Sequence, residues 1–284
     1  MSVYGVIIAG GQGKRLWPLS RLLRPKPVLA IPKDISLIQQ ALARLKTVVD
    51  SSSIYVVTNE EVFAPVYGAV QDLPLENIFS EPLGRNTAAA IGLACIHIID
   101  RDSDALAIVS PADHYIGDDE QFARLLHTAV DVCRTTDTVV VFGVKPASAS
   151  TNYGYIARGE PLEGTGAFKV ARFMEKPQQQ TAEQFVAEGY LWNAGIFVFK
   201  VSTMLQAIGQ HMPELAAALE NIRKAFKGPY ERKTIKEEYA QLRDISIDKG
   251  VIEKLDRVSI IGMDIPWADL GSFEQIANVM MAKD

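Results

Sequence analysis

Apolar stretches of strand length alternate with helical patterns through the first half of the sequence, and this alternation limits the fold more than any other feature. The stretches lie at 3–9, 54–58, 105–109 and 138–144, and the helical patterns at 36–49, 62–70, 86–99 and 120–133. Continuous apolar strands that are joined by helices are typical of a parallel sheet with helices on both faces.

The second half of the sequence is less regular. Strands are predicted at 153–158, 168–175, 195–199 and 258–262, and helices at 181–188, 204–239 and 273–282, with breaks at Pro213 and Gly228. We therefore predict a Rossmann-like α/β fold with a mixed, mostly parallel sheet and helices on both faces. A chain of 284 residues buries enough surface for one large core, so we expect a single domain over residues 1–284.

Charge and cysteine usage exclude several classes of protein. The net charge is −5 and no Lys/Arg run is present, which indicates no nucleic-acid partner and no membrane-surface partner. The sequence lacks the roughly 18 consecutive apolar residues of a membrane span, and its start lacks the basic region of a signal peptide. Cys95 and Cys133 lie outside metal-ligand spacings, and we expect buried, reduced thiols. These features favour a cytoplasmic protein.

A glycine-rich segment, GGQGKR at 10–15, follows the first predicted strand. Its glycines let backbone N–H groups approach a phosphate closely, and Lys14 and Arg15 add positive charge. The P-loop pattern is absent, and Leu16 stands where a dinucleotide-binding loop would need its third glycine. Taken alone, the segment predicts either a phosphate-binding loop or a tight turn after a strand.

Charged residues also stand near the ends of other predicted elements. Lys26 is held between two prolines, and Asp113 follows the strand at 105–109. Ligands of open parallel sheets bind at the carboxyl ends of the strands, so Asp113 is well placed to hold a divalent cation against phosphate oxygens. His114 is expected to be structural, because no second His or Cys lies at ligand spacing.

A second group of polar residues lies in the less regular half. Glu175 and Lys176 end the strand at 168–175, Asn193 stands beside the strand at 195–199, and Asp269 adjoins a glycine turn. A carboxylate or an amide can bind sugar hydroxyls, and a lysine can meet a phosphate. The alternative for Glu175 and Lys176 is an ion pair on the surface.

Eight short motifs carry a resemblance to a known family. In order they are GGQGKRLWPLS, RPKP, EPLGRNTAAAI, SPADHYI, YGYI, FMEKP, WNAGIF and WADLGS. Their number and order resemble the sugar-1-phosphate nucleotidyltransferase family over residues 3 to 276. The wording of EPLGRNTAAAI and SPADH is similar to the guanylyl branch of that family.

The resemblance implies roles for individual residues. It divides the domain into a nucleotide-binding half at 1–110 and a sugar-phosphate-binding half at 111–284. For the nucleotide it implies Ala9, Gly10, Gly11, Gly13, Lys14, Arg15, Glu81, Asn86, Thr87 and Asp113, and for the sugar Gly154, Glu175, Lys176 and Asn193. The implied catalytic residues are Arg15, Lys26, Asp113 and Lys176, and the implied ligands of a Mg²⁺ cofactor are Asp113 and Asp269.

The reaction that the resemblance implies is transfer of a guanylyl group from GTP to mannose 1-phosphate, giving GDP-mannose and pyrophosphate. A sugar-phosphate oxygen is already an anionic nucleophile, so positioning and electrostatics suffice and no catalytic triad is expected. The alternatives are another nucleoside triphosphate, another sugar 1-phosphate such as glucose or heptose, and a non-catalytic subunit of the same fold.

Two positions depart from the pattern of the family. Pro27 stands where many mannose enzymes carry Gln, and Lys249 where many carry Tyr. The second change lies in a region that approaches the sugar, so it bears on which sugar is used. Longer relatives continue into a β-helical or isomerase domain after the last motif, and we expect no isomerase activity here. A homodimer is the expectation from the family.

Overall fold

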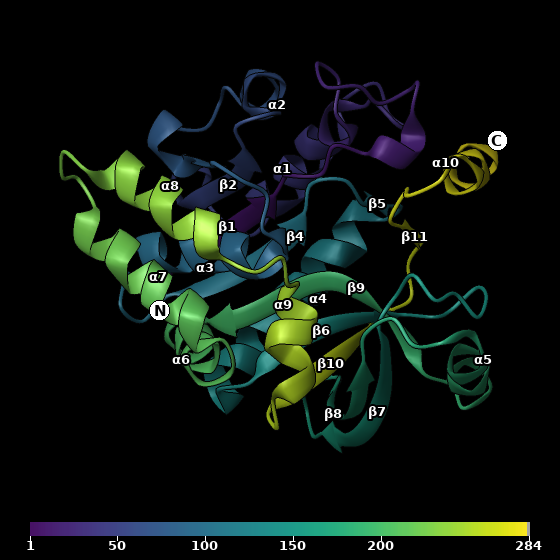
Figure 1. Cartoon of the computed structure of the whole chain (residues 1–284). Coiled ribbons are helices and arrows are strands. Elements are labelled where there is room, and N and C mark those ends of the chain that lie inside the picture. The colour runs from purple at the N-terminus through teal and green to yellow at the C-terminus, as the bar shows by residue number, and fades with distance from the viewer. Residues whose placement is uncertain (283–284) are drawn as a thin grey trace.

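A nine-stranded mixed sheet runs through the centre of the computed structural model, which describes residues 1–282 (Figure 1). The strand order is β3-β2-β1-β4-β9-β6-β10-β8-β7. The strands are β1 (Val3–Ile8), β2 (Ile54–Asn59), β3 (Ile78–Glu81), β4 (Leu106–Pro111), β6 (Val139–Val144), β7 (Tyr155–Leu162), β8 (Ala167–Met174), β9 (Leu191–Lys200) and β10 (Val258–Met263).

The first half of the sheet is parallel, as the alternation of strands and helices predicts. Strand β1 pairs in parallel with β2 and β4, and β2 pairs in parallel with β3. Strand β9 then lies between β4 and β6 and is antiparallel to both. Strands β7 and β8 form a hairpin whose β8 is antiparallel to β10. The predicted mixed α/β fold is confirmed, and the antiparallel contacts come from its second half.

Helices cover both faces because side chains alternate along the buried strands. Val6 of β1 packs on the face of α3, α6 and α7, and Ile7 packs on the face of α1 and α4. The helices are α1 (Leu37–Lys46), α2 (Phe63–Ala69), α3 (Asn86–Ile99), α4 (Asp119–Thr136), α5 (Gln179–Ala187), α6 (Val201–His211), α7 (Pro213–Ala225), α8 (Glu231–Gln241), α9 (Ile247–Gly250) and α10 (Phe273–Met281). None of the helices in the described part of the chain is long and apolar enough to cross a bilayer.

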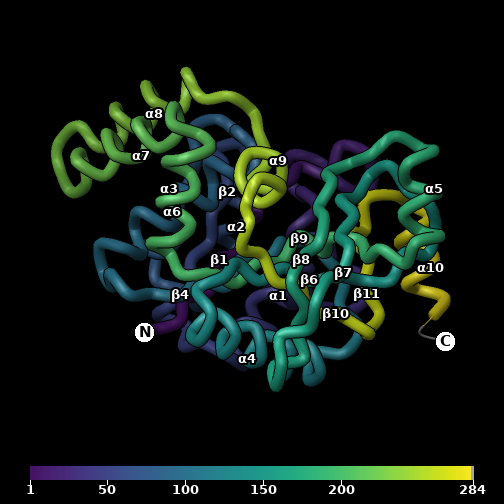
Figure 2. The backbone as a smooth tube through the Cα atoms, turned by 90° about the horizontal axis from the view of Figure 1, so that it is seen from below, coloured from purple at the N-terminus to yellow at the C-terminus, as the bar shows by residue number. Residues whose placement is uncertain are grey.

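The helices at the two ends of the sheet mark out the region between them. Figure 2 shows α7 and α8 at one end, α5 and α10 at the other, and α9 between them. The carboxyl ends of β1, β3 and β4 carry Gly10, Glu81 and Asp113, respectively. Because the carboxyl ends of parallel strands lie at the same edge of a sheet, three of the predicted nucleotide residues come together at that edge.

Several local predictions need correction. The predicted breaks at Pro213 and Gly228 are confirmed, since the pattern at 204–239 is divided there into α6, α7 and α8, but Pro213 starts α7, at a position where its missing N–H costs nothing. Asn193 lies inside β9, since that strand starts four residues earlier than predicted. No strand was expected at β3, which has four residues, or at β5 (Tyr115–Ile116) and β11 (Trp267–Ala268), which form a two-stranded sheet of their own. Segments this short carry no readable periodicity.

Candidate active site

Lys26 lies at the centre of a compact charged group. It starts a short 3₁₀ turn, Lys26–Val28, in which the flanking prolines fix the backbone, and its side chain is buried. Its Nζ lies 2.8 Å from Oδ2 of Asp113 and also donates to the backbone carbonyl of Asp269. Three residues from distant parts of the sequence thus meet at one ammonium group.

The glycine-rich segment passes over this group. A Cβ on Gly11 would lie 3.6 Å from Oδ2 of Asp113, so the backbone runs directly beside that carboxylate. Gly13 has a φ of 71°, and a Cβ there would lie 2.6 Å from Cβ of Lys26, so no other residue fits. Asn59 Nδ2 donates to the carbonyl of Gly10 at 2.8 Å, which holds the start of the loop. The loop can therefore present its backbone N–H groups to a bound anion.

Asp269 and Arg15 complete the group. Oδ1 of Asp269 accepts from the hydroxyl of Tyr153 at 2.9 Å and from the Gly271 amide at 3.3 Å. A Cβ on Gly271 would lie 2.9 Å from Nη2 of Arg15 and 3.0 Å from Oδ2 of Asp269, so both groups reach the same spot. We call Arg15, Lys26, Asp113 and Asp269 the Lys26 cluster.

The electrostatics of the Lys26 cluster keep Asp113 charged. Burial opposes ionisation of its carboxyl, but the Lys26 ammonium and His114 hold its pKa below the usual value. Burial lowers the pKa of His114 to about 4, which leaves the imidazole neutral at pH 7. His114 packs edge-on against Trp267, and its carbonyl accepts from Arg44 at 3.2 Å. These contacts agree with the structural role expected for His114.

Two carboxylates of the Lys26 cluster suit a hard divalent cation. Within residues 1–282 no group of three or more His, Cys, Asp or Glu side chains is arranged to hold a metal ion. Mg²⁺ does not need such a group, because one or two carboxylates together with substrate phosphates are its usual ligands. Asp113 and Asp269 supply oxygen donors beside a loop built for phosphate, so the residues fit Mg²⁺ bound together with a nucleotide.

The residues predicted to meet the base and ribose lie in two places. A cavity of ≈ 350 Å³ is lined by Gly10, Gln12, Gly13, Lys14, Asn59, Glu61, Pro82, Leu83 and Gly84. Glu81 lies beneath it, with Oε2 4.0 Å from the position of a Cβ on Gly10, and burial raises its pKa to about 8. Asn86 and Thr87 instead face the segment before α9: Asn86 donates to Asp244 at 2.8 Å, and Thr87 accepts from the Ile247 amide at 2.9 Å.

The predicted sugar residues form a second network. The backbone amide of Asn193 donates to the carbonyl of Gly154 at 2.8 Å. A Cβ on Gly154 would lie 2.5 Å from Oε2 of Glu175, so a larger residue there would displace this carboxylate. Lys176 pairs with Glu175 at 2.7 Å. Asn193 Nδ2 donates to Asp248 at 2.6 Å, and its Oδ1 accepts from the Gly195 amide at 3.0 Å.

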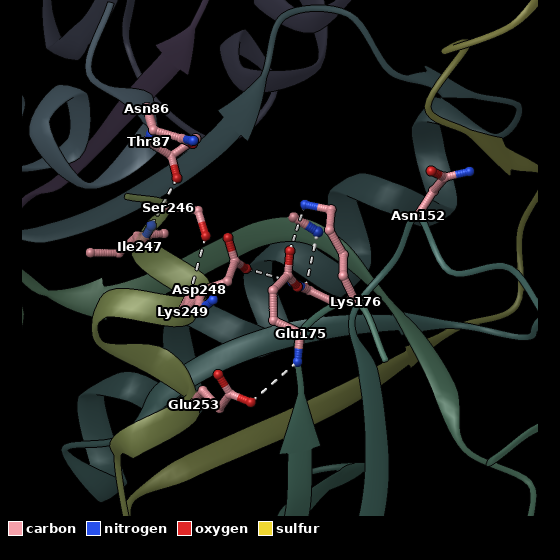
Figure 3. A network of polar contacts seen from close by, with 12 residues as sticks. Asn86, Thr87, Asn152, Glu175, Lys176, Ser246, Ile247, Asp248, Lys249 and Glu253 are labelled. Atoms are coloured by element: carbon pink, nitrogen blue, oxygen red, sulfur yellow. Dashed lines mark hydrogen bonds and ion pairs between the residues drawn. The ribbon is translucent and has the colours of Figure 1, made fainter. Parts of the chain in front are cut away.

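Asp248 joins this network, although the sequence patterns indicate no role for it. Figure 3 shows its carboxyl group beside that of Glu175, with Lys176 on the other side of Glu175. Burial and the charge of Glu175 raise the pKa of Asp248 to about 7. We call Glu175, Lys176, Asn193 and Asp248 the Asn193 network. It borders a cavity of ≈ 820 Å³ that Glu175, Lys176, Lys249 and Asn86 help to line.

Unusual backbone angles lie beside both groups. Five non-glycine residues of the described chain have positive φ, and three of them, Asn86, Lys176 and Leu270 at 64°, 48° and 48°, lie beside the predicted site residues, whereas Asp137 and Lys227 do not. L-residues adopt this region at a cost, and such positions gather at functional sites. Leu270 follows Asp269 directly, and Lys176 follows Glu175, so the fold holds strained backbone where the predicted site residues meet.

Comparisons with known proteins agree with the geometry. A family model described as "Nucleotidyl transferase" matches residues 4–284. A mannose-1-phosphate guanylyltransferase of Escherichia coli K12 is 36% identical over 286 residues, covering 98% of this chain and 59% of the relative. The alginate biosynthesis protein AlgA of Pseudomonas syringae pv. tomato is 34% identical over 289 residues, covering 98% of this chain and 58% of the relative. The chain therefore spans less than two thirds of the length of these relatives.

A solved structure is also similar over nearly the whole chain. It is a crystal structure from Thermus thermophilus described as a mannose-1-phosphate geranyltransferase, with a TM-score of 0.88 and 34% identity. The match covers 98% of this chain and 79% of that one. From the family model and these similarities, we conclude that the chain belongs to the nucleotidyl transferase family.

Proposed function

We propose that this chain transfers a guanylyl group from GTP to mannose 1-phosphate, with Mg²⁺ as cofactor, and releases GDP-mannose and pyrophosphate. The observation that carries the proposal is the meeting of Asp113, Asp269 and Lys26 beside the glycine-rich loop. The names of the relatives from Escherichia coli and Thermus thermophilus support the mannose substrate over glucose or heptose.

The chemistry of the Lys26 cluster suits this reaction. The difficulty lies in bringing two polyanions together and stabilising charge on the α-phosphate and on the departing pyrophosphate. Lys26 and Arg15 supply positive charge, and the loop at 10–15 supplies backbone N–H groups. Mg²⁺ held by Asp113 and Asp269 would neutralise further charge on the phosphate oxygens. A phosphate oxygen of the sugar then attacks the α-phosphate in line, and pyrophosphate leaves with the P–O bond electrons.

The Asn193 network has the chemistry of a sugar site. Glu175 offers carboxylate oxygens to hydroxyl donors, and Lys176, whose side chain is 58% exposed, can reach a phosphate. Asn193 is buried, and its side-chain amide is fixed by Asp248 and by the backbone N–H of Gly195. The N–H and the oxygen lone pair that remain free on this side chain therefore point in fixed directions. A fixed amide beside a carboxylate distinguishes hydroxyl positions better than a mobile one, because it is already ordered.

Two further parts of the proposal concern the base and the location. Guanine presents N1–H and N2–H₂ donors, and a carboxyl group such as that of Glu81 can accept from them. Cys95 and Cys133 are buried and unpaired, which suits a protein that works in the reducing cytoplasm.

A substrate panel tests the proposal. GTP, ATP, UTP and dTTP are each combined with mannose, glucose and heptose 1-phosphates in the presence of Mg²⁺, and pyrophosphate release is followed. We expect GTP with mannose 1-phosphate to be the fastest pair. A different fastest pair would replace the substrates, and no release with any pair would contradict the enzymatic function itself.

A further inference from the structure

Tyr153 joins the two groups of the site, and its ring is held firmly. The ring packs against Trp192 with centroids 4.5 Å apart and against Trp267 with centroids 5.7 Å apart. Its hydroxyl contacts the carboxylate of Asp269, and the next residue, Gly154, contacts Asn193 through the backbone. Tyr153 thus connects the Lys26 cluster to the Asn193 network.

The direction of the hydrogen bonds around the hydroxyl is fixed. Oε1 of Gln275 accepts from the backbone amides of Gly271 and Ser272 at 2.6 Å and 3.1 Å, so Nε2 must face Tyr153. Nε2 can only donate, so the oxygen of Tyr153 accepts that bond and its own proton goes to Oδ1 of Asp269.

This arrangement determines which oxygen of Asp269 is available. Oδ1 is engaged by the Tyr153 hydroxyl and the Gly271 amide. Oδ2 makes neither of these contacts and lies by Gly271, which the guanidinium of Arg15 also approaches. Without the hydroxyl, one weak contact at 3.3 Å from a backbone amide would be left to hold the carboxylate in this orientation.

We infer that Tyr153 is a positioning residue that aims Oδ2 of Asp269 at a divalent cation and links this carboxylate to the sugar-side segment at Gly154. The inference rests on the proposed function for the identity of the cation. A hydrogen bond from outside the coordination sphere fixes the orientation of a ligating carboxylate, and its loss typically weakens metal affinity about 10-fold or more.

The chain offers a matched control for this inference. Tyr155 is buried, whereas Tyr153 is partly buried, and the Tyr155 hydroxyl donates to the carbonyl of Ser150 at 2.9 Å. Tyr155→Phe therefore removes a hydrogen-bonded hydroxyl two residues away without touching Asp269. Tyr153→Phe keeps the ring that packs between the two tryptophans, so both variants should fold.

The experiment measures how much Mg²⁺ tightens the binding of GTP. The Kd of GTP is determined by calorimetry with and without Mg²⁺, without any sugar phosphate, for the wild type, Tyr153→Phe, Tyr155→Phe and Asp269→Asn, and each Tm is recorded. We expect Tyr153→Phe to reduce the tightening about 10-fold, with its Kd in the absence of Mg²⁺ and its Tm close to those of Tyr155→Phe. Asp269→Asn should reduce it further.

Four results would overturn the inference. Tyr153→Phe could keep the full effect of Mg²⁺, or Tyr153→Phe and Tyr155→Phe could lose it equally, as a general loosening of the fold would produce. Asp269→Asn could also keep the effect, or the wild type could show none, so that Asp269 is not a metal residue. In that last case the substrate panel decides separately whether the nucleotidyl transfer itself survives.

Discussion

The Lys26 cluster and the Asn193 network differ in what surrounds one carboxyl group in each, Asp113 and Asp248. In the Lys26 cluster the carboxylate of Asp113 pairs with a buried cation, Lys26, at 2.8 Å. In the Asn193 network Glu175 pairs with the exposed Lys176, and Asp248 faces Glu175 with a neutral amide as its own partner. The pKa of Asp113 is accordingly lowered, and that of Asp248 is raised.

This difference matches what each region is proposed to bind. Phosphates bring several negative charges, so the Lys26 cluster needs permanent cations whose charge survives burial. Sugar hydroxyls bring no charge but require both donors and acceptors, and a carboxyl group that titrates near neutrality can serve as either. If the comparison is correct, changes in the first region should affect turnover, and changes in the second should affect sugar binding and the response to pH.

The largest expected effect is that of Lys26→Met. The ammonium is buried and holds both Asp113 and the segment of Asp269, so its loss removes charge stabilisation and leaves Asp113 unpaired. We expect kcat to fall by about 100-fold or more in a pyrophosphate-release assay. The control is Lys33→Met, since Lys33 pairs with Asp119 at 2.6 Å away from the site and should alter kcat by no more than about twofold. Equal losses of kcat in both variants would contradict the proposed role of Lys26 in stabilising charge during the reaction.

A smaller and more selective effect is expected for Glu175→Gln. The carboxylate is partly buried beside Gly154 and Lys176, and replacing it with an amide removes a charged acceptor for sugar hydroxyls. We predict that the KM for mannose 1-phosphate rises about 10-fold, while the KM for GTP changes little. Glu183→Gln is the control, because Glu183 is exposed on α5 and accepts from Gln179 of the same helix. A larger change in the KM for GTP than in that for the sugar would mean that Glu175 serves the nucleotide.

The smallest effect concerns stability and pH. The pKa of Asp248 is raised from 3.8 to about 7, so the folded protein keeps a proton that the unfolded chain has lost in that interval. Its contribution therefore lowers the free energy of unfolding as pH rises from about 4 to about 7, and the decrease levels off above pH 7. Asp248→Asn removes this contribution, so urea unfolding should show the variant gaining stability relative to wild type across that range. Parallel pH profiles for the two proteins would be inconsistent with a protonated Asp248.

The sequence predicts one part of the Lys26 cluster, the glycine-rich loop beside Asp113, better than it predicts the contacts of Asp269 or the Asn193 network. Asp113 follows β4, and the glycine-rich loop follows the adjacent parallel strand β1. The carboxyl ends of neighbouring parallel strands meet at one edge of the sheet, and this alone brings the two together. Asn193 and Asp248 are 55 residues apart, and Tyr153 and Asp269 are 116 apart. Contacts of that kind depend on how β9, α9 and α10 pack, which no local pattern in the sequence records.

The backbone conformation can likewise be predicted from the sequence only in part. The boundaries of α3 and the N-cap Ser36 of α1 follow from helical periodicity and capping chemistry, and both predictions are confirmed. The positive φ values at Lys176 and Leu270 could not be predicted, because neither residue type favours that region. They arise where the surrounding structure forces the chain to turn beside the site.

The most direct test of the account is the Mg²⁺ dependence of pyrophosphate release from GTP and mannose 1-phosphate by the wild type and by the double variant Asp113→Asn, Asp269→Asn. Both substitutions keep the size of the side chain and remove the charge that would hold the cation. The account predicts Mg²⁺-dependent release for the wild type and its loss in the double variant at every Mg²⁺ concentration. A double variant that keeps Mg²⁺-dependent release would contradict the assignment of this site.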